Sequence, residues 1–462
     1  MTRKNKTMII ALGVLVLLGA GYYGTTIQSR NRAAALAEEL PPPTPTLGNL
    51  DSSEVVKLEV SGMVLQRQDD MWELVSLDGG APPEGVELDQ GMLRNIVFVL
   101  ATVWAERIAE EYPEDLAEFG LDPPVSRAVV TDSHGNTAVY LVGDETPFRN
   151  SYFVMAEGNP NVFVVNAFSA DRLRFTLDDI RNRFLFPPQL PLHALTRMRI
   201  ESPGAVIDMS LMPESRPLHL VSTFSRFIMT SPYNLPRGVD NEAIEALLAP
   251  FNNRRIGEFV NDSPLSLAPY GLENPVARFR LEFGVTYIDL LIGNRSGPDR
   301  YAKLADAPGV FTVSGLDPVV NITPFALVDR FALLVGINEV DRLSISGGER
   351  PLNANFQGEG PDMIFHLNGR RTEEQSSRNW FQSVIALRVD AEIPAGGGFN
   401  PASPENITVE YHFRNGERAS LTLIPFNRDF YALSQEGTTE FLIARSQVRR
   451  IFQTADMVID EG

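Results

Sequence analysis

Two six-residue stretches decide how this chain is organised, Phe119-Gly120-Leu121-Asp122-Pro123-Pro124 and Tyr270-Gly271-Leu272-Glu273-Asn274-Pro275. Each one reads aromatic residue, Gly, Leu and acid, followed by proline, and each precedes a run of strand-like segments. The landmarks that follow keep step with each other, namely Gly143 with Gly293, Tyr152 with Tyr301 and Phe163 with Phe311. Because these separations drift by only a few residues, we interpret the two regions as one inherited module used twice.

A third, divergent copy follows without the Gly-Leu turn. Its opening strand is expected at residues 343–345, and residues 407–413 alternate between apolar and polar side chains before the hairpin signal Asn415-Gly416. A short motif after the first helix recurs three times, as Arg107-Ile108-Ala109-Glu110, Arg255-Ile256-Gly257-Glu258 and Arg388-Val389-Asp390-Ala391-Glu392. We therefore predict a cytoplasmic tip and transmembrane anchor (1–32), a Pro-rich linker (33–49), repeat module 1 (50–190), repeat module 2 (191–336) and a divergent repeat module 3 (337–462).

Each module combines strands with helices in its sequence pattern. Turn signals such as residues 132–136 separate consecutive strands by so few residues that only antiparallel neighbours can be joined. Asp89 and Asp240 are N-cap candidates for a first helix in modules 1 and 2. In module 1 the expected helix faces are Met92, Leu93, Ile96, Val97, Leu100, Val103, Trp104 and Ile108 for the first helix and Leu173, Leu177, Ile180 and Phe184 for the second. The predicted fold class is α+β, an N-terminal transmembrane helix followed by three tandem repeated modules, each a mainly antiparallel sheet with two helices.

Composition limits the classes of partner. A chain of 462 residues that is 44% hydrophobic and 21% charged is globular and long enough for about three domains. The formal net charge of −19 disfavours nucleic acid as a partner, and also an anionic lipid surface as the main partner. The chain has no cysteine, which excludes a disulfide framework and a thiolate metal site.

The N-terminal region predicts a membrane location. Residues 7–29 carry no charged side chain, and Arg3, Lys4 and Lys6 precede them. Such a run is long enough to cross a bilayer as a helix, and the basic residues favour a cytoplasmic N-terminus. The expected localisation is the cytoplasmic (inner) membrane, single-pass, with the body periplasmic or extracytoplasmic. A cleaved signal peptide is the alternative, with Ala35-Leu36-Ala37 as the cleavage site.

We predict no catalytic, cofactor-binding or metal-binding residue, no cofactor, and a protein that is not an enzyme. The sequence has no HExxH motif, GxSxG elbow or P-loop. Metal-ligand spacing is absent among the histidines, His134, His193, His219, His366 and His412. Asp122 and Glu273 recur at one module position, where a structural turn role is favoured over a ligand role. The acidic run Glu106, Glu110, Glu111, Glu114 and Glu118 is interpreted as a solvated surface.

The predicted anchor, the two Gly-Leu turns, Val142-Gly143-Asp144 and Ile292-Gly293-Asn294 together resemble the domain-of-unknown-function 4340 family. The resemblance covers residues from about 55 to 335 well and module 3 only loosely. It implies a bacterial single-pass envelope protein, often encoded near a gliding-motility-type ABC transporter and its auxiliary subunits. The family has no agreed catalytic residues, so the resemblance assigns none to this chain.

Two hypotheses about function follow. The first is a membrane-anchored extracytoplasmic, non-enzymatic scaffold or accessory protein associated with an ABC-type, gliding-motility-like transporter system. Its expected partners are the membrane and a protein, either the transporter permease or a companion envelope subunit. The alternative is a protein that binds or hydrolyses an envelope glycan or peptide at a site between modules. A cleft with converging carboxylates and aromatic side chains would favour this alternative.

Overall fold

The structure is a computed structural model that describes residues 45–147, 150–187, 191–215, 221–222, 224–358, 360 and 363–461. The predicted anchor and most of the Pro-rich linker lie outside these residues. Within them, no helix is both long enough and apolar enough to cross a membrane. Contacts divide the chain into two compact units, one ending at Asn182 and lacking residues 83–85, the other formed by 83–85 and the chain from Arg183 onward.

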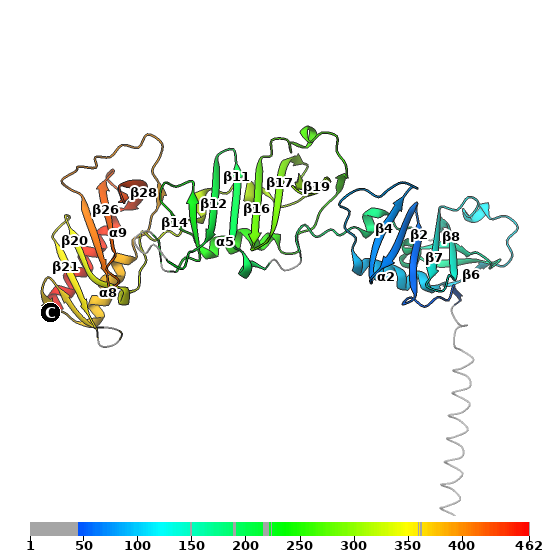
Figure 1. The fold of residues 1–462 in the computed structure, drawn as a ribbon, viewed down its shortest axis with the longest axis horizontal. Coiled ribbons are helices and arrows are strands. Elements are labelled where there is room, and N and C mark those ends of the chain that lie inside the picture. Colours follow the sequence, from blue (N-terminus) through cyan, green and yellow to red (C-terminus); the bar gives the residue numbers. More distant parts are fainter. Residues whose placement is uncertain are drawn as a thin grey trace, which may run out of the picture. The chain divides into compact units, whose positions relative to one another are not determined.

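Antiparallel pairing accounts for every strand ladder of the described residues, and the strands form four sheets (Figure 1). One is a two-stranded sheet of β1 (Thr46–Leu47) and β5 (Val103–Trp104). The first large sheet has the order β4-β3-β2-β7-β8-β9-β10-β6, with β2 Val55–Val60, β3 Met63–Gln68, β4 Met71–Leu77, β6 Arg107–Glu110, β7 Ser126–Asp132, β8 Thr137–Glu145, β9 Ser151–Ala156 and β10 Val162–Asn166.

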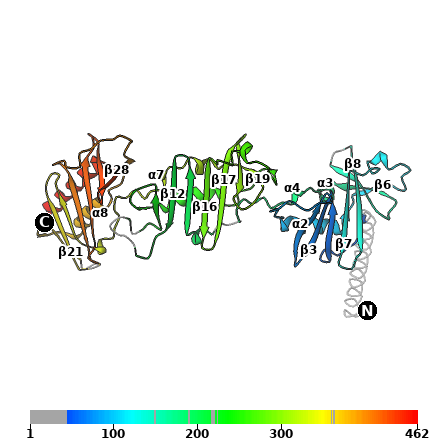
Figure 2. The same ribbon diagram turned by 45° about the horizontal axis from the view of Figure 1, so that its top comes forward.

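The second and third sheets belong to the C-terminal unit (Figure 2). The second has the order β14-β13-β12-β11-β16-β17-β18-β19-β15, with β11 Arg197–Ser202, β12 Ala205–Leu211, β13 Phe227–Ser231, β14 Arg237–Gly238, β15 Phe259–Asn261, β16 Ala277–Phe283, β17 Thr286–Ser296, β18 Asp299–Leu304 and β19 Val310–Val313. The third has the order β23-β22-β21-β20-β25-β26-β27-β28-β24, with β20 Val340–Ser346, β21 Leu352–Gln357, β22 Ile364–Leu367, β23 Arg370–Arg371, β24 Ala391–Glu392, β25 Ile407–Phe413, β26 Arg418–Pro425, β27 Phe430–Gln435 and β28 Thr438–Ala444.

The three large sheets share one strand order. The opening strand pairs on one side with the hairpin strands that follow it, and on the other side with the first strand after the Gly-Leu turn or its equivalent. These central pairs are β2 with β7, β11 with β16, and β20 with β25. The short strand that precedes the turn crosses to the far edge, as β6, β15 and β24.

Helices are few in the described chain. The α-helices are α2 Gln90–Ala101, α3 Ala167–Arg172, α4 Leu177–Ile180, α5 Asn241–Leu248, α6 Asp317–Val320, α7 Pro324–Leu327, α8 Glu374–Ile385 and α9 Arg445–Glu461. The 3-10 turns are η1 Ala117–Phe119, η2 Leu192–Ala194, η3 Ala249–Phe251, η4 Ala268–Tyr270 and η5 Ile337–Glu339. Asp89 and Asp240 cap α2 and α5 by accepting backbone N–H bonds.

The predicted fold class, α+β with two helices in every module, is therefore wrong, while the transmembrane helix that it includes lies outside the described residues. The described residues are mostly antiparallel sheet, and their helices are few and mainly short. Leu173 and Leu177 were expected on one helix, but α3 ends at Arg172 and a new helix, α4, starts after Thr176. The Thr176 side chain and Asp179 form a capping box there, which stabilises a helix start in the middle of the expected helix.

The helix face expected at residues 92–108 is also too long. The helix α2 ends at Ala101, and Val103 and Trp104 lie in β5, where Leu47 of β1 pairs with Val103. Apolar residues at helical spacing continue past the helix because a short strand also buries alternate side chains. Sequence spacing alone does not separate these two cases.

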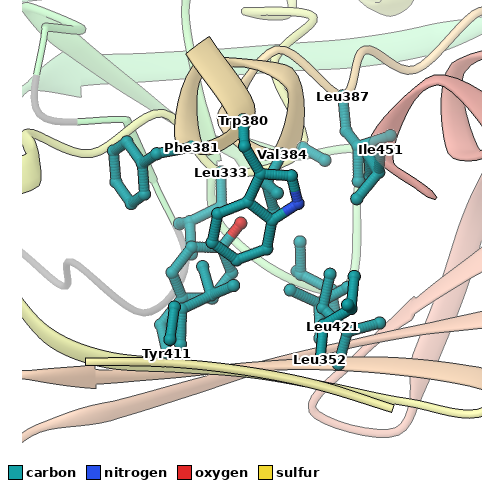
Figure 3. Close-up of a cluster of buried hydrophobic side chains, with 14 of the residues drawn as sticks. Leu333, Leu352, Trp380, Phe381, Val384, Leu387, Tyr411, Leu421 and Ile451 are labelled. Carbon is teal, nitrogen blue, oxygen red and sulfur yellow. The ribbon is translucent and has the colours of Figure 1, made fainter. Parts of the chain in front are cut away.

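One face of the third sheet carries its helices and a closed core. Figure 3 shows Trp380 of α8 pointing at the sheet, with Tyr411 of β25 and Leu421 of β26 below it. Trp380 and Tyr411 are fully buried. The helix α9 adds an apolar stripe at helical spacing, Val448, Ile451, Phe452, Ala455 and Val458, to the same core.

Extended connectors, which we call straps, lead into the second and third sheets. Residues 183–185 hydrogen-bond to residues 254–256, and residues 330–332 hydrogen-bond to residues 387–389. In the N-terminal unit, β1 pairs with β5 at the corresponding place before β6. Each strap therefore covers the segment that leads to the far-edge strand.

At the start of the strap at residues 330–332, a residue bonded to the second sheet is followed directly by a residue bonded toward the third sheet. The N–H of Asp329 donates to the carbonyl of Gly238 in β14 at 2.8 Å. The carbonyl of the next residue, Arg330, accepts from the N–H of Val389 at 2.7 Å. Consecutive residues are thus bonded to β14 of the second sheet and to the segment that leads into β24 of the third, which restrains one sheet against the other.

The two Gly-Leu turns explain the repeated sequence landmarks. Gly120 and Gly271 end η1 and η4 in the left-handed region, with φ of 65° and 68°, which glycine adopts without steric cost. Gly143 and Gly293 lie directly under the same turns. A Cβ on Gly143 would lie 2.1 Å from the carbonyl oxygen of Phe119, and a Cβ on Gly293 would lie 2.2 Å from the equivalent oxygen in the second turn. Each turn therefore packs so closely on the strand end that only glycine fits at Gly143 and Gly293.

We expect Gly293→Ala to lower the free energy of unfolding by about 2 kcal/mol or more, because its Cβ must displace a backbone carbonyl. Urea denaturation of the purified protein would measure the change. Gly204→Ala is the matched control in the same unit, since a Cβ there meets nothing within 4 Å and its φ lies outside the left-handed region. Equal stability of the two variants would contradict the close approach of turn and strand.

Candidate functional site

A lattice of alternating charges covers the solvent side of the second sheet. Along β11 and β16 the apolar side chains point to the core, so the residues between them point outward. We call this set the arginine lattice, and it consists of Arg197, Arg199, Glu201, Asp208, Arg278, Arg280, Glu282 and Asp289.

The first half of the lattice is built around Asp208 of β12. Arg197 donates to its two carboxylate oxygens from Nε at 2.9 Å and from Nη2 at 2.6 Å. Arg199 donates from Nη1 to Asp208 at 2.7 Å and from Nε to Glu201 at 2.7 Å. One carboxylate therefore orients two guanidinium groups, and a second carboxylate fixes the rotation of one of them.

The second half repeats this arrangement around Asp289 of β17. Arg278 donates to the two carboxylate oxygens of Asp289 from Nε at 2.8 Å and from Nη2 at 2.7 Å. Arg280 donates from Nη1 to Asp289 at 3.2 Å and from Nε to Glu282 at 2.9 Å. Each bond has a counterpart in the first half with the same atoms.

The pairing of β11 with β16 relates the two halves by a local two-fold. Arg199 lies directly opposite Arg280, while Arg197 faces Glu282 and Glu201 faces Arg278. On the outer strands, Asp208 is the partner of Arg199 and Asp289 is the partner of Arg280. The central row therefore reads acid, base, base, acid across four strands.

The lattice keeps its carboxylates charged. Hydrogen bonds from Arg197 and then Arg199 hold the pKa of Asp208 below its usual value. Burial works against the charged form of Asp289, but hydrogen bonds and charge from Arg278 and Arg280 outweigh it, so the pKa of Asp289 is also lowered. These groups stay ionised at neutral pH and are poorly suited to transfer protons there.

A hollow lies at the centre of the lattice. It is lined by four arginines and two glutamates, Arg197, Arg199, Glu201, Arg278, Arg280 and Glu282, which gives the lining a formal charge of +2. Asp208 and Asp289 do not line the hollow, and their side chains are only 12% and 3% exposed. The cations therefore face the hollow, while the carboxylates that orient them lie on the flanking strands.

A second cluster joins the second sheet to the third. Buried Arg237 of β14 donates from Nη1 to Gln435 Oε1 at 2.6 Å and from Nη2 to Glu440 Oε2 at 2.9 Å. Its guanidinium carbon lies 4.7 Å from the ring centre of Phe441. Tyr233 donates to Glu392 Oε1 at 2.6 Å, and burial with that carboxylate raises the pKa of Tyr233.

This junction contains the aromatic and acidic side chains that a site between modules would need, but they bind one another. The cavity beside Arg237, Phe331 and Phe441 has room for about one water molecule. The junction thus holds two sheets together, and its cavity, as the described residues line it, is too small for a glycan or peptide.

The residues weighed as candidates in the sequence do not converge. Asp122 and Glu273 are exposed in their turns, and Glu273 accepts a hydrogen bond from Ser266 at 3.3 Å. Asp132 shapes the turn before His134 by accepting backbone N–H bonds. His219 lies outside the described residues. In the described part of the chain, no group of three or more His, Asp or Glu side chains could hold a metal ion.

Sequence reasoning missed the lattice, although the signal was present. The alternation of Arg278, Arg280 and Glu282 indicates one solvated sheet face, but the same Arg-x-Arg-x-Glu pattern starts at Arg197. In both copies an aspartate follows on the next strand, Asp208 and Asp289. The repeat that marks the lattice lies between two strands of one sheet, β11 and β16, which are paired although they are about 80 residues apart.

Comparison with known proteins identifies one family. A family model described as "Domain of unknown function (DUF4340)" matches residues 47–217 and 228–382. No curated protein and no solved structure matches the chain. The matched ranges contain all eight residues of the arginine lattice.

We expect Asp289→Asn to lower the free energy of unfolding at neutral pH by about 1–3 kcal/mol, because two arginines lose a charged acceptor. Chemical denaturation of the variant and the wild type would measure this loss of unfolding free energy. Asp341→Asn, at an exposed position of β20, removes the same charge where the described residues give no ion pair, and is the control. A loss equal to that of the control would mean that the lattice contributes no stability.

Stability should also fall in acid through the same carboxylates. The folded-state pKa values of Asp208 and Asp289 lie below 3.8, so their contribution is complete above that pH and is lost as the pH falls through the folded values. The wild type should therefore lose more stability below about pH 4 than the Asp208→Asn/Asp289→Asn variant. Parallel curves of unfolding free energy against pH would contradict this.

Truncating Arg237 to alanine should destabilise the C-terminal unit by about 3 kcal/mol, since Glu440 is left nearly buried without its cation. We expect the second and third sheets to separate into two unfolding transitions in calorimetry. Arg342→Ala, on β20 away from this junction, is the control and should keep a single transition.

Proposed function

Since the chain belongs to the DUF4340 family, whose description assigns no activity, we propose that it is a non-enzymatic extracytoplasmic scaffold or accessory protein. The observation that carries the proposal is the way its charged groups are used. Two carboxylates with lowered pKa values, Asp208 and Asp289, hold arginines in place, and the buried Arg237 joins two sheets. Charges fixed in this way suit binding and assembly better than proton transfer.

Restraint between sheets also supports a scaffold. The strap that passes from Asp329 to Arg330 and the junction around Arg237 keep the second and third sheets in one compact unit. A partner that contacts both sheets would meet a surface that is already ordered, so less conformational entropy is lost on binding.

We place the body outside the cytoplasm, at the inner membrane. The support is sequence alone, the uncharged residues 7–29 behind Arg3, Lys4 and Lys6, and these lie outside the described residues. The family resemblance supports a particular partner, the permease of an ABC-type, gliding-motility-like transporter or its companion envelope subunit. The net charge of −19 suits a partner with basic patches.

The alternative, a glycan- or peptide-binding or hydrolysing protein with a site between modules, has less support. The carboxylates and aromatic rings at the junction, Glu392, Glu440, Tyr233 and Phe441, already contact each other or Arg237. A ligand there would have to displace these contacts.

Purification of the full chain from detergent-solubilised membranes tests the scaffold proposal. We expect a transporter permease or its envelope companion to co-purify, identified by mass spectrometry against an unrelated membrane protein with the same tag. Asp122→Asn and Glu273→Gln should leave recovery unchanged. Loss of the cellular function in either variant at normal abundance and partner recovery would favour the enzyme or ligand-site alternative.

Protease accessibility tests the location separately. Protease added to intact spheroplasts should digest the body from about residue 45 onward, whereas a cytoplasmic marker protein should survive. Complete protection of the body until the membrane is lysed would reverse the proposed topology.

A further inference from the structure

We infer that the hollow of the arginine lattice is a binding site for a phosphate group. This ligand site does not depend on the scaffold proposal, and it lies on the open face of one sheet. Its lining carries a formal charge of +2, and Asp208 and Asp289 on the flanking strands bring the whole lattice to zero. The global net charge of −19 opposes long-range attraction of anions, so recognition must come from local geometry.

Unused hydrogen-bond donors are the first observation. Arg197 and Arg278 use Nε and Nη2 for their aspartates, which leaves Nη1 without a partner among the described residues. Arg199 and Arg280 use Nε and Nη1, which leaves Nη2 without a described partner. Four guanidinium groups that line one hollow thus each keep a terminal nitrogen for an acceptor.

Preorganisation is the second observation. Asp208 and Asp289 each bind two arginines, while Glu201 and Glu282 each fix one more nitrogen. Arginine side chains otherwise lose rotamer entropy when a ligand fixes them. In the lattice that cost is met during folding, so a ligand would not have to order the side chains.

The like charges at the centre are the third observation. Arg199 and Arg280 are directly opposite on β11 and β16, an arrangement that is unfavourable for two cations without an anion between them. Asp208 and Asp289 compensate each one only from the outer side of the row. An anion in the hollow would be attracted by both arginines at once.

The number and type of donors favour phosphate over a carboxylate. A carboxylate offers two oxygens, whereas a terminal phosphate offers three and carries close to two charges at neutral pH. Each remaining guanidinium nitrogen can donate a charge-assisted hydrogen bond to a phosphate oxygen, so four arginines together supply donors for several oxygens. The local two-fold also fits a diphosphate, with one phosphate group on each half of the lattice.

The phosphate could come from a soluble molecule or from a lipid headgroup, and the experiment separates these sources. The full chain in a non-ionic detergent is titrated with inorganic phosphate and pyrophosphate by isothermal calorimetry, with chloride, sulfate and acetate at equal ionic strength. For the lipid source, the chain is mixed with phosphatidylcholine vesicles that contain or lack phosphatidic acid. The fraction of the chain that floats with each kind of vesicle is then compared. Saturable binding of phosphate or pyrophosphate, or recruitment of the phosphatidic acid vesicles, is the expected result.

Matched single-charge variants assign the binding to the hollow. Arg199→Gln should weaken binding of the probe about tenfold or more, because a charge-assisted donor is lost. Arg295→Gln also removes one charge from the second sheet, but Arg295 pairs with Asp317 outside the hollow, so it should bind like the wild type. If Arg199→Gln fails to fold, Arg199→Lys keeps the charge and should still lose affinity at an unchanged unfolding midpoint.

Three outcomes would overturn the inference. One is equal binding of phosphate, sulfate and chloride that Arg199→Gln does not change, which would indicate an adventitious ion only. Another is binding of acetate as tightly as phosphate. The last is no saturable binding of either soluble probe together with no preference for phosphatidic acid vesicles.

Discussion

The pairing of each opening strand with the strand beyond the Gly-Leu turn, or its equivalent in the third sheet, is the constraint on which the rest depends. Through β2 with β7, β11 with β16 and β20 with β25, it joins two halves of a module that are far apart in sequence. The pairing brings a distant strand back to the opening strand, so it must offset the entropy of closing a long loop. Burial of the apolar residues on the core face of the paired strands supplies that free energy.

The arginine lattice is a consequence of the same pairing. Antiparallel register places Arg199 opposite Arg280 and makes the two Arg-x-Arg-x-Glu segments equivalent. With the opposite faces of these strands committed to the core, a slip of one residue would bury the arginines and expose Ile200 and Phe279. The hydrophobic core therefore fixes the geometry of a polar surface that it does not touch.

Arginine has two different roles in this protein. In the lattice it is partly exposed and oriented by carboxylates, with one terminal nitrogen left over. At the junction, Arg237 is buried and its partners Gln435 and Glu440 come from the third sheet. A buried ion pair of this kind adds specificity more than stability, because the cost of desolvation offsets most of the attraction. It selects one arrangement of two sheets that otherwise present similar edges.

The sequence by itself determined the two Gly-Leu turns and the family, because glycine, proline and apolar alternation act within a few residues. It located Gly120 and Gly143, although not the distance of 2.1 Å that would separate a Cβ on Gly143 from the carbonyl oxygen of Phe119. It failed on helix number, since apolar residues spaced three or four apart also fit short helices and strands such as α4 and β5. Only the tertiary structure decided that Arg199 and Arg280 share one hollow and that Arg237 joins two sheets, because these contacts depend on register and packing between segments that local sequence rules do not relate.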